Sequence, residues 1–166
     1  MQRENRDIET EFLDELDSHQ GILHKVCFIY SNNSLEKEDL YQEVILQLWK
    51  SFSSFKHQSS FSTWMYRVAL NTALSLTKKP RMFVKTAHFP DSSYEIEHSM
   101  NKSEDVKIMY KAISHLNKVE KAIILLWLED KSYEEIADAI GMSVKNISVR
   151  LVRIKAKLIN IIKKYK

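Results

Sequence analysis

The sequence predicts an all-α fold of two small helical domains, and three observations support this. Only 2 of the 166 residues are glycine and 2 are proline, far below the usual ~7% and ~5%. The tight turns that join β-strands are therefore scarce. Apolar residues recur at helical spacing along most of the chain, but this periodicity stops between residues 81 and 104. We expect a helical domain over 1–80, a flexible linker over 81–104 and a helix-turn-helix domain over 105–166.

In the first domain, apolar residues near helical spacing predict a helix within 10–30 and another over 36–52. The second of these also carries a polar face with one apolar member, formed by Asp39, Gln42, Glu43 and Leu46. Such a face is typical of a protein docking site. A solvated face with one stray leucine is the alternative.

A third helix is expected over 61–79, ending before Pro80. One stripe of this helix and the polar loop 53–60 before it combine aromatic and basic residues without any acid. The stripe consists of Trp64, Arg67, Asn71, Ser75 and Lys78, and the loop contributes Phe55, Lys56 and His57. This mixture suits the stacking of unpaired bases beside a track of phosphates, although Trp64 could equally belong to the core. The expected core face is Phe61, Met65, Val68, Ala69, Thr72 and Leu76.

The region 132–158 has the local signals of a helix-turn-helix. Ser132 followed by Glu135 forms a capping box that opens a helix over 133–140. Gly141 allows a tight turn, and Ser143 can cap a second helix. The apolar positions of that second helix step by three and four residues: Val144, Ile147, Leu151, Ile154 and Leu158.

The opposite face of this last helix carries bases, an amide and two valines. Its members are Lys145, Asn146, Val149, Val152, Arg153 and Ala156. Basic and amide groups suit phosphates and base edges in a major groove, and exposed valines can contact thymine methyl groups. The alternatives are an ordinary helix pair in a bundle or a protein-binding face.

Charge is distributed unevenly behind the net charge of +3. Residues 1–17 hold seven acids, whereas 44–90 and 145–166 hold no acid and seven and eight bases, respectively. Two separate basic stretches favour two contacts with a polyanion. On charge alone, a solvated basic surface is the alternative.

Several functional classes are not expected. The longest apolar run, 122–128, is far shorter than the ~20 residues that cross a bilayer, and the polar N-terminus is unlike a secretory signal. The single cysteine, Cys27, excludes an intrachain disulfide framework. No His-Glu-x-x-His spacing or Gly-rich phosphate loop occurs. We therefore expect a cytoplasmic protein without membrane insertion, catalytic residues, metal or cofactor.

Taken together, three segments resemble an extracytoplasmic-function (ECF) sigma factor of bacterial RNA polymerase, within the sigma-70 superfamily. EDLYQEVILQLWKSF at 38–52 is similar to the polymerase-binding helix of that family. FSTWMYRVALNTAL at 61–74 resembles the segment that recognises and opens the minus-ten promoter element. The segment 132–158 resembles the helix-turn-helix that reads the minus-thirty-five element. Departures from the family pattern include Leu70, Asn117, Ser148 and Val149.

The resemblance implies core RNA polymerase and promoter DNA as partners, and an anti-sigma factor, because family members are often held inactive by one. It implies that Asp39, Gln42, Glu43, Leu46 and Trp49 dock on the clamp helices of the polymerase, and that 118–129 contacts the flap. It implies minus-ten contacts by Phe55, Lys56, His57, Trp64, Arg67, Asn71 and Lys78. It implies minus-thirty-five contacts by Lys145, Asn146, Ser148, Val149, Arg150, Val152 and Arg153. A free-standing helix-turn-helix regulator and a protein-binding helical adaptor are the alternatives.

Overall fold

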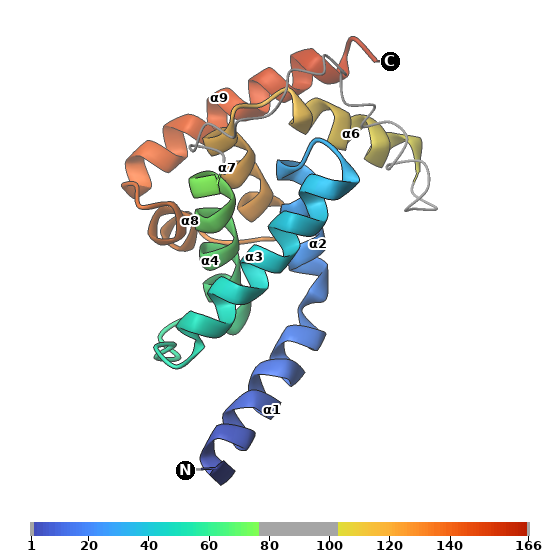
Figure 1. The fold of residues 1–166 in the computed structure, drawn as a ribbon. Coiled ribbons are helices and arrows are strands. Elements are labelled where there is room, and N and C mark those ends of the chain that lie inside the picture. The colour runs from blue at the N-terminus through green and yellow to red at the C-terminus, as the bar shows by residue number, and fades with distance from the viewer. Residues whose placement is uncertain (1, 77–102, 166) are drawn as a thin grey trace.

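The computed structural model describes residues 2–76 and 103–165, and within these ranges it contains eight helices and no strand (Figure 1). The all-α expectation is therefore confirmed. We call α1 to α4 the N-terminal half and α6 to α9 the C-terminal half. The helices are α1 (Gln2–Ser18), α2 (Gln20–Tyr30), α3 (Ser34–Phe52), α4 (Phe61–Leu76), α6 (Glu104–Ser114), α7 (Lys118–Leu128), α8 (Tyr133–Ile140) and α9 (Val144–Ile162). Most of the predicted linker, and Lys78, lie outside the described residues.

The helix expected within 10–30 is in fact two helices, which meet at His19. The hydroxyl of Ser18 donates to the Asp14 carbonyl at 2.9 Å, and Nδ1 of His19 lies 2.8 Å from the Glu15 carbonyl. Such back-bonding side chains compete with the helical backbone pattern, and Gly21 lowers the helical propensity further. As a result the chain changes direction between α1 and the start of α2, and α1 projects from the bundle (Figure 1).

The N-terminal half is built on α2, α3 and α4, which pack against one another. Asn33 caps α3 by accepting a hydrogen bond from the backbone N–H of Glu36, so this helix begins two residues earlier than predicted. Four apolar residues of α3, spaced four apart along the helix, are buried: Leu40, Val44, Leu48 and Phe52.

The C-terminal half has the predicted helix-turn-helix in α8 and α9. Both hydrogen bonds of the Ser132–Glu135 capping box are present. Gly141 takes the left-handed conformation with φ of 75°, and the Ser143 hydroxyl accepts from the Asn146 N–H. A second capping box, between Asn117 and Glu120, opens α7.

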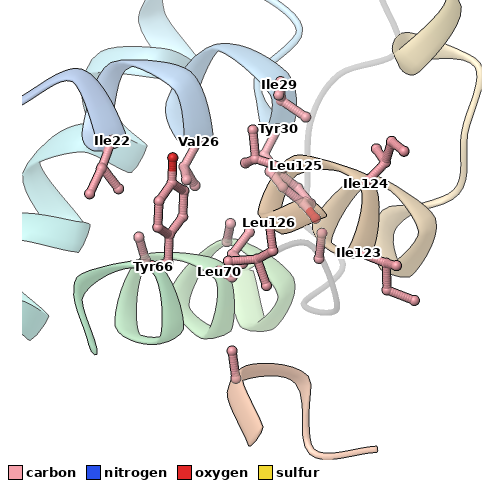
Figure 2. Close-up of a cluster of buried hydrophobic side chains, with 14 of the residues drawn as sticks. Ile22, Val26, Ile29, Tyr30, Tyr66, Leu70, Ile123, Ile124, Leu125 and Leu126 are labelled. Carbon is pink, nitrogen blue, oxygen red and sulfur yellow. The ribbon is translucent and has the colours of Figure 1, made fainter. Parts of the chain in front are cut away.

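The two halves share one hydrophobic core rather than standing apart. Figure 2 shows buried side chains from α2, α4 and α7 gathered in a single cluster. Helix α7 is central to it, because its five consecutive residues 122–126 are all buried. A helix that is apolar on every side can be covered only by neighbours all round it.

This packing changes which side of α4 is buried. Of the expected core face, Phe61, Met65 and Ala69 are buried, whereas Val68, Thr72 and Leu76 are only half-buried. Instead Tyr66 and Leu70 are almost completely covered. The expected core face covers one side of α4, whereas in the structure this helix packs against α7 and α8 as well as against α2 and α3.

Candidate functional site

The first candidate surface is the polar face of α3, defined by Asp39, Gln42, Glu43, Leu46 and Trp49. Leu46 and Trp49 are 43% and 42% exposed, although both are large apolar side chains. The Trp49 ring is held edge-on by Phe12 of α1, with ring centroids 5.1 Å apart. Glu43 accepts a hydrogen bond from Gln47 at 2.8 Å. The face therefore combines acidic and amide groups with two exposed apolar side chains on a rigid helix.

The second candidate surface is an aromatic cluster at the start of α4, formed by Phe52, Phe55, His57, Phe61 and Trp64. Phe55 lies between two rings, with centroids 4.4 Å from His57 and 4.9 Å from Trp64. The backbone of His57 has a positive φ of 52°, an uncommon conformation in which His is enriched, and this bends the loop. Aromatic rings that are partly open to solvent are platforms for stacking of bases.

Trp64 belongs in part to the core, which was one of the two alternatives for its position. Its ring is half-buried and contacts Phe61 with centroids 5.2 Å apart, so it anchors the cluster to the core. Phe55 of the loop before α4 packs on the same ring with centroids 4.9 Å apart, and Lys56 and His57 of that loop are exposed. Asn71, further along α4, is exposed.

Arg67 is exposed to solvent, but its guanidinium already pairs with an acid of the same chain. Its Nη1 donates to Oδ2 of Asp138 in α8 at 3.2 Å, so an acid from the C-terminal half meets the predicted basic stripe. Next to it, the Thr63 hydroxyl donates to Glu135 at 3.0 Å. The hydrogen bond from the Ser132 N–H holds the pKa of Glu135 below its ordinary value, and the hydrogen bond from Thr63 and the positive charge of the nearby Lys131 act in the same direction.

The third candidate surface is the outer face of α9, which comprises Lys145, Asn146, Val149, Val152, Arg153 and Ala156. All six are exposed, while Ile147, Leu151, Ile154 and Leu158 on the other side are buried. Val144 is 39% exposed, so its predicted place in the buried stripe is wrong. As the first residue of α9, Val144 lies before the point where neighbouring helices cover this stripe. Ser148 and Arg150 flank the outer face and are half-buried.

The five bases of α9 differ in their contacts. Lys157 pairs with Glu120 at 2.8 Å, and the Lys155 ammonium lies 4.1 Å from the centroid of the Trp127 ring, so these two fasten α9 to α7. Lys145 and Arg153 make no hydrogen bond or ion pair with any other described residue. Arg150 donates from Nε to Asn146 at 3.1 Å. The free cations therefore lie on the outer face, beside Val149 and Val152.

Two contributors to these surfaces were missed at the level of sequence. Phe12 buttresses Trp49, and a helical register that included α1 could have found it. Asp138, the partner of Arg67, carries no local signal, because only the packing of α8 on α4 brings the two together.

The described ranges contain no helix long and apolar enough to cross a membrane. Within the same ranges there is no group of three or more histidine, cysteine, aspartate or glutamate residues placed to hold a metal ion.

Comparisons with known proteins agree with this arrangement. Residues 16–81 match the family model of Sigma-70 region 2, and residues 107–158 match that of Sigma-70, region 4. An ECF RNA polymerase sigma-E factor of Haemophilus influenzae is 31% identical over 136 residues, which cover 74% of this chain and 72% of the relative.

Two solved structures share the fold. One is the sigma factor RpoE in complex with the anti-sigma factor NepR from Bartonella quintana, with a TM-score of 0.67, 22% identity, and coverage of 95% of this chain and 98% of that one. The other is CnrH in complex with the cytosolic domain of CnrY, with a TM-score of 0.69, 19% identity, and coverage of 95% and 91%. From the two matched regions, their order and the helix-turn-helix geometry, the chain belongs to the sigma-70 family and is an ECF-type sigma factor of bacterial RNA polymerase.

Proposed function

We propose a division of labour among the three surfaces of this sigma factor. The polar face of α3 docks on the clamp helices of core RNA polymerase. The aromatic cluster, with Lys56, Arg67 and Asn71, captures unpaired bases of the minus-ten element. The outer face of α9, with Ser148 and Arg150 at its edge, reads the minus-thirty-five duplex.

The observation that carries this proposal is the composition of the outer face of α9. Val149 and Val152 are 44% and 68% exposed on a well-packed helix, and uncovered Lys145 and Arg153 lie beside them. Exposed valines among cations suit a major groove, where thymine methyl groups and phosphates lie close together. The helix is the second of a helix-turn-helix, which is the element that enters the groove in this motif.

Strand capture at α4 is supported by an energetic comparison. Extruding a base from a duplex costs a few kcal/mol, and stacking on an aromatic side chain returns about 1–3 kcal/mol. One captured base therefore roughly balances its own extrusion. Contacts of Arg67 and Lys56 with the strand, together with docking on the polymerase, supply the remaining free energy.

The proposal also covers the regulation of the protein and its location in the cell. Both solved structures of similar fold hold a second protein, in one case named as an anti-sigma factor, and this supports an anti-sigma partner for this chain. Core polymerase acts in the cytoplasm, where we place the protein. It contributes binding free energy to initiation and catalyses no reaction itself.

The test is transcription in vitro with core polymerase on a promoter library, together with capture of polymerase by tagged protein. We expect Arg153→Glu to lower specific transcription about 5- to 150-fold, the equivalent of 1–3 kcal/mol for a base-contacting arginine, and to leave capture unchanged. Lys164→Glu, which makes the same charge change at an exposed site beyond α9, is the matched control.

The second arm of the same experiment addresses α3. Gln42→Ala combined with Glu43→Ala should weaken capture of polymerase, whereas Glu134→Ala, which removes an exposed carboxylate from the C-terminal half, should not. If Arg153→Glu abolished capture as well as promoter recognition, the division of labour would be wrong. Capture that is unaffected by the α3 variant would remove that role from α3.

A further inference from the structure

The outer face of α9 has an apolar centre. Val149, Val152 and Ala156 are spaced three and four residues apart, so they lie on one line along the helix. Val149 and Val152 are 44% and 68% exposed, and Ala156 is exposed as well. Helices α6, α7 and α8 pack against α9 and cover its opposite side, where its buried residues lie (Figure 1). We call these three residues the apolar line.

The charged groups that remain free stand at the start and on the flank of the apolar line. Lys145 begins it, one turn before Val149. Arg153 lies to one side, since each residue of a helix turns the side chain by about 100°. Neither base makes a hydrogen bond or ion pair with any other described residue. Both are therefore available to bind the phosphates of a duplex.

The amide on the same flank is already engaged in a hydrogen bond. Oδ1 of Asn146 accepts from Nε of Arg150 at 3.1 Å. Recognition of adenine by an amide uses both its oxygen, as acceptor, and its N–H, as donor. This use of Asn146 would require the bond to Arg150 to break or to be shared. The two side chains therefore restrain each other, and the apolar line between the flanks contributes no hydrogen bond at all.

Apolar side chains at the centre of a DNA-reading face restrict what that face can recognise. In the major groove every base pair presents hydrogen-bonding groups, and thymine alone adds an apolar group, the methyl on C5. A valine placed against a polar base edge removes water and returns no hydrogen bond, which costs binding free energy. Placed against a thymine methyl group, it buries apolar surface instead, which is favourable.

The spacing of the two valines fits neighbouring bases. Three residues of an α-helix span about 4.5 Å along its axis. Successive nucleotides of one strand are about 3.4 Å apart along a duplex. Two side chains on one line of the helix can therefore reach two adjacent base pairs.

We propose that Val149 and Val152 are specificity-determining residues that read the C5 methyl groups of two adjacent thymines in the upstream duplex. Lys145 and Arg153 bind the phosphates beside them. This rests on the proposed function of α9 and adds the class of sequence that it takes. Because the methyl group itself is recognised, 5-methylcytosine, which carries the same group on the same ring carbon, is accepted in place of thymine.

The first experiment uses holoenzyme, assembled from core polymerase and the full chain, to select from duplexes that are randomised in the upstream segment. One pool contains thymine and the other contains uracil, which lacks only the C5 methyl group. We expect the thymine pool to yield adjacent thymines and the uracil pool to show no preference for uracil.

Single substitutions in the selected duplex then measure each methyl group. Each change of thymine to uracil should weaken binding about 4-fold, which corresponds to the burial of one methyl-sized group. Cytosine at the same position should bind more weakly than 5-methylcytosine by a similar factor. Electrophoretic mobility shift of the holoenzyme measures these affinities.

The same contacts are tested from the protein side by Val149→Ala and Val152→Ala. Each variant should lose the preference for thymine over uracil at one of the two positions and keep it at the other. Ile159→Ala is the matched control, because Ile159 is an aliphatic residue of α9 that is 53% exposed and lies about two turns beyond Val152. It should keep both preferences.

The possible failures are distinguishable. A selected duplex without adjacent thymines, or one whose affinity survives both uracil substitutions, would overturn methyl reading. If Arg153→Glu still abolished the selection, the proposed function of α9 would stand. No selected upstream sequence, together with no effect of Arg153→Glu, would overturn both. If the valine variants lost capture of polymerase and kept their thymine preference, the apolar line would be a protein contact and the inference would be wrong.

Discussion

The chain's two glycines are expected to respond in opposite directions to the same substitution. Gly141 ends α8 with φ of 75°, whereas Gly21 lies in the first turn of α2. A Cβ atom at either position would meet nothing within 4 Å, so steric clashes do not decide the outcome. Whether alanine stabilises or destabilises the protein is therefore decided by the backbone conformation at each position.

The magnitudes follow from that preference. Alanine in the left-handed region costs roughly 1–2 kcal/mol, whereas alanine in place of a helical glycine gains up to about 1 kcal/mol. For a chain of this size, 1 kcal/mol shifts Tm by about 2–4 °C. Gly141→Ala should lower Tm by about 2–8 °C, and Gly21→Ala should raise it by up to about 4 °C.

Thermal unfolding followed by far-UV circular dichroism measures both shifts. Gly141→Asn is the internal control, because asparagine tolerates the left-handed region better than alanine and should cost less. If both alanine variants shifted Tm in the same direction, backbone preference would not be the cause. The conformation assigned to Gly141 would then be wrong.

Two further predictions concern helix termini. Asn117→Ala removes the cap of α7 and should destabilise the protein by about 1 kcal/mol in urea unfolding; an unchanged midpoint would show that this cap contributes nothing. The pKa of Glu135 lies below its ordinary value of 4.5, so its contribution to stability is complete above that value and is lost as the pH falls through the folded-state pKa. Glu135→Gln should therefore be less stable than wild type at neutral pH, by a fraction of a kcal/mol because the group is exposed. The difference should shrink in acid, and one that was constant with pH would contradict this reasoning.

The helix-turn-helix could be predicted in detail because its signals are local. Each signal acts only on residues a few positions away. Ser132 caps α8, Gly141 forms the turn and Ser143 caps α9, and all three have the expected geometry. The outer face of α9 follows from helical periodicity alone. Its exposure was therefore predictable, whereas the partners of its side chains remain a proposal.

The burial of Tyr66 and Leu70 could not be predicted in this way. Both lie in the cluster that α4 forms with α2 and α7, so part of their cover comes from a helix of the other half (Figure 2). The pairing of Arg67 with Asp138 has the same origin, since 71 residues separate the two in sequence. Periodicity shows that a helix has an apolar face, but not how many neighbours it will have.

The burial of residues 122–126 of α7 on every side has a consequence for the lifetime of the protein. If the two halves separated, apolar side chains at residues 122–126 that pack against α2 and α4 would meet water. Such an opened molecule, without its polymerase, would be prone to aggregation and accessible to chaperones and proteases. The supply of active protein then depends on how fast opened molecules are engaged as well as on how fast new chains are synthesised.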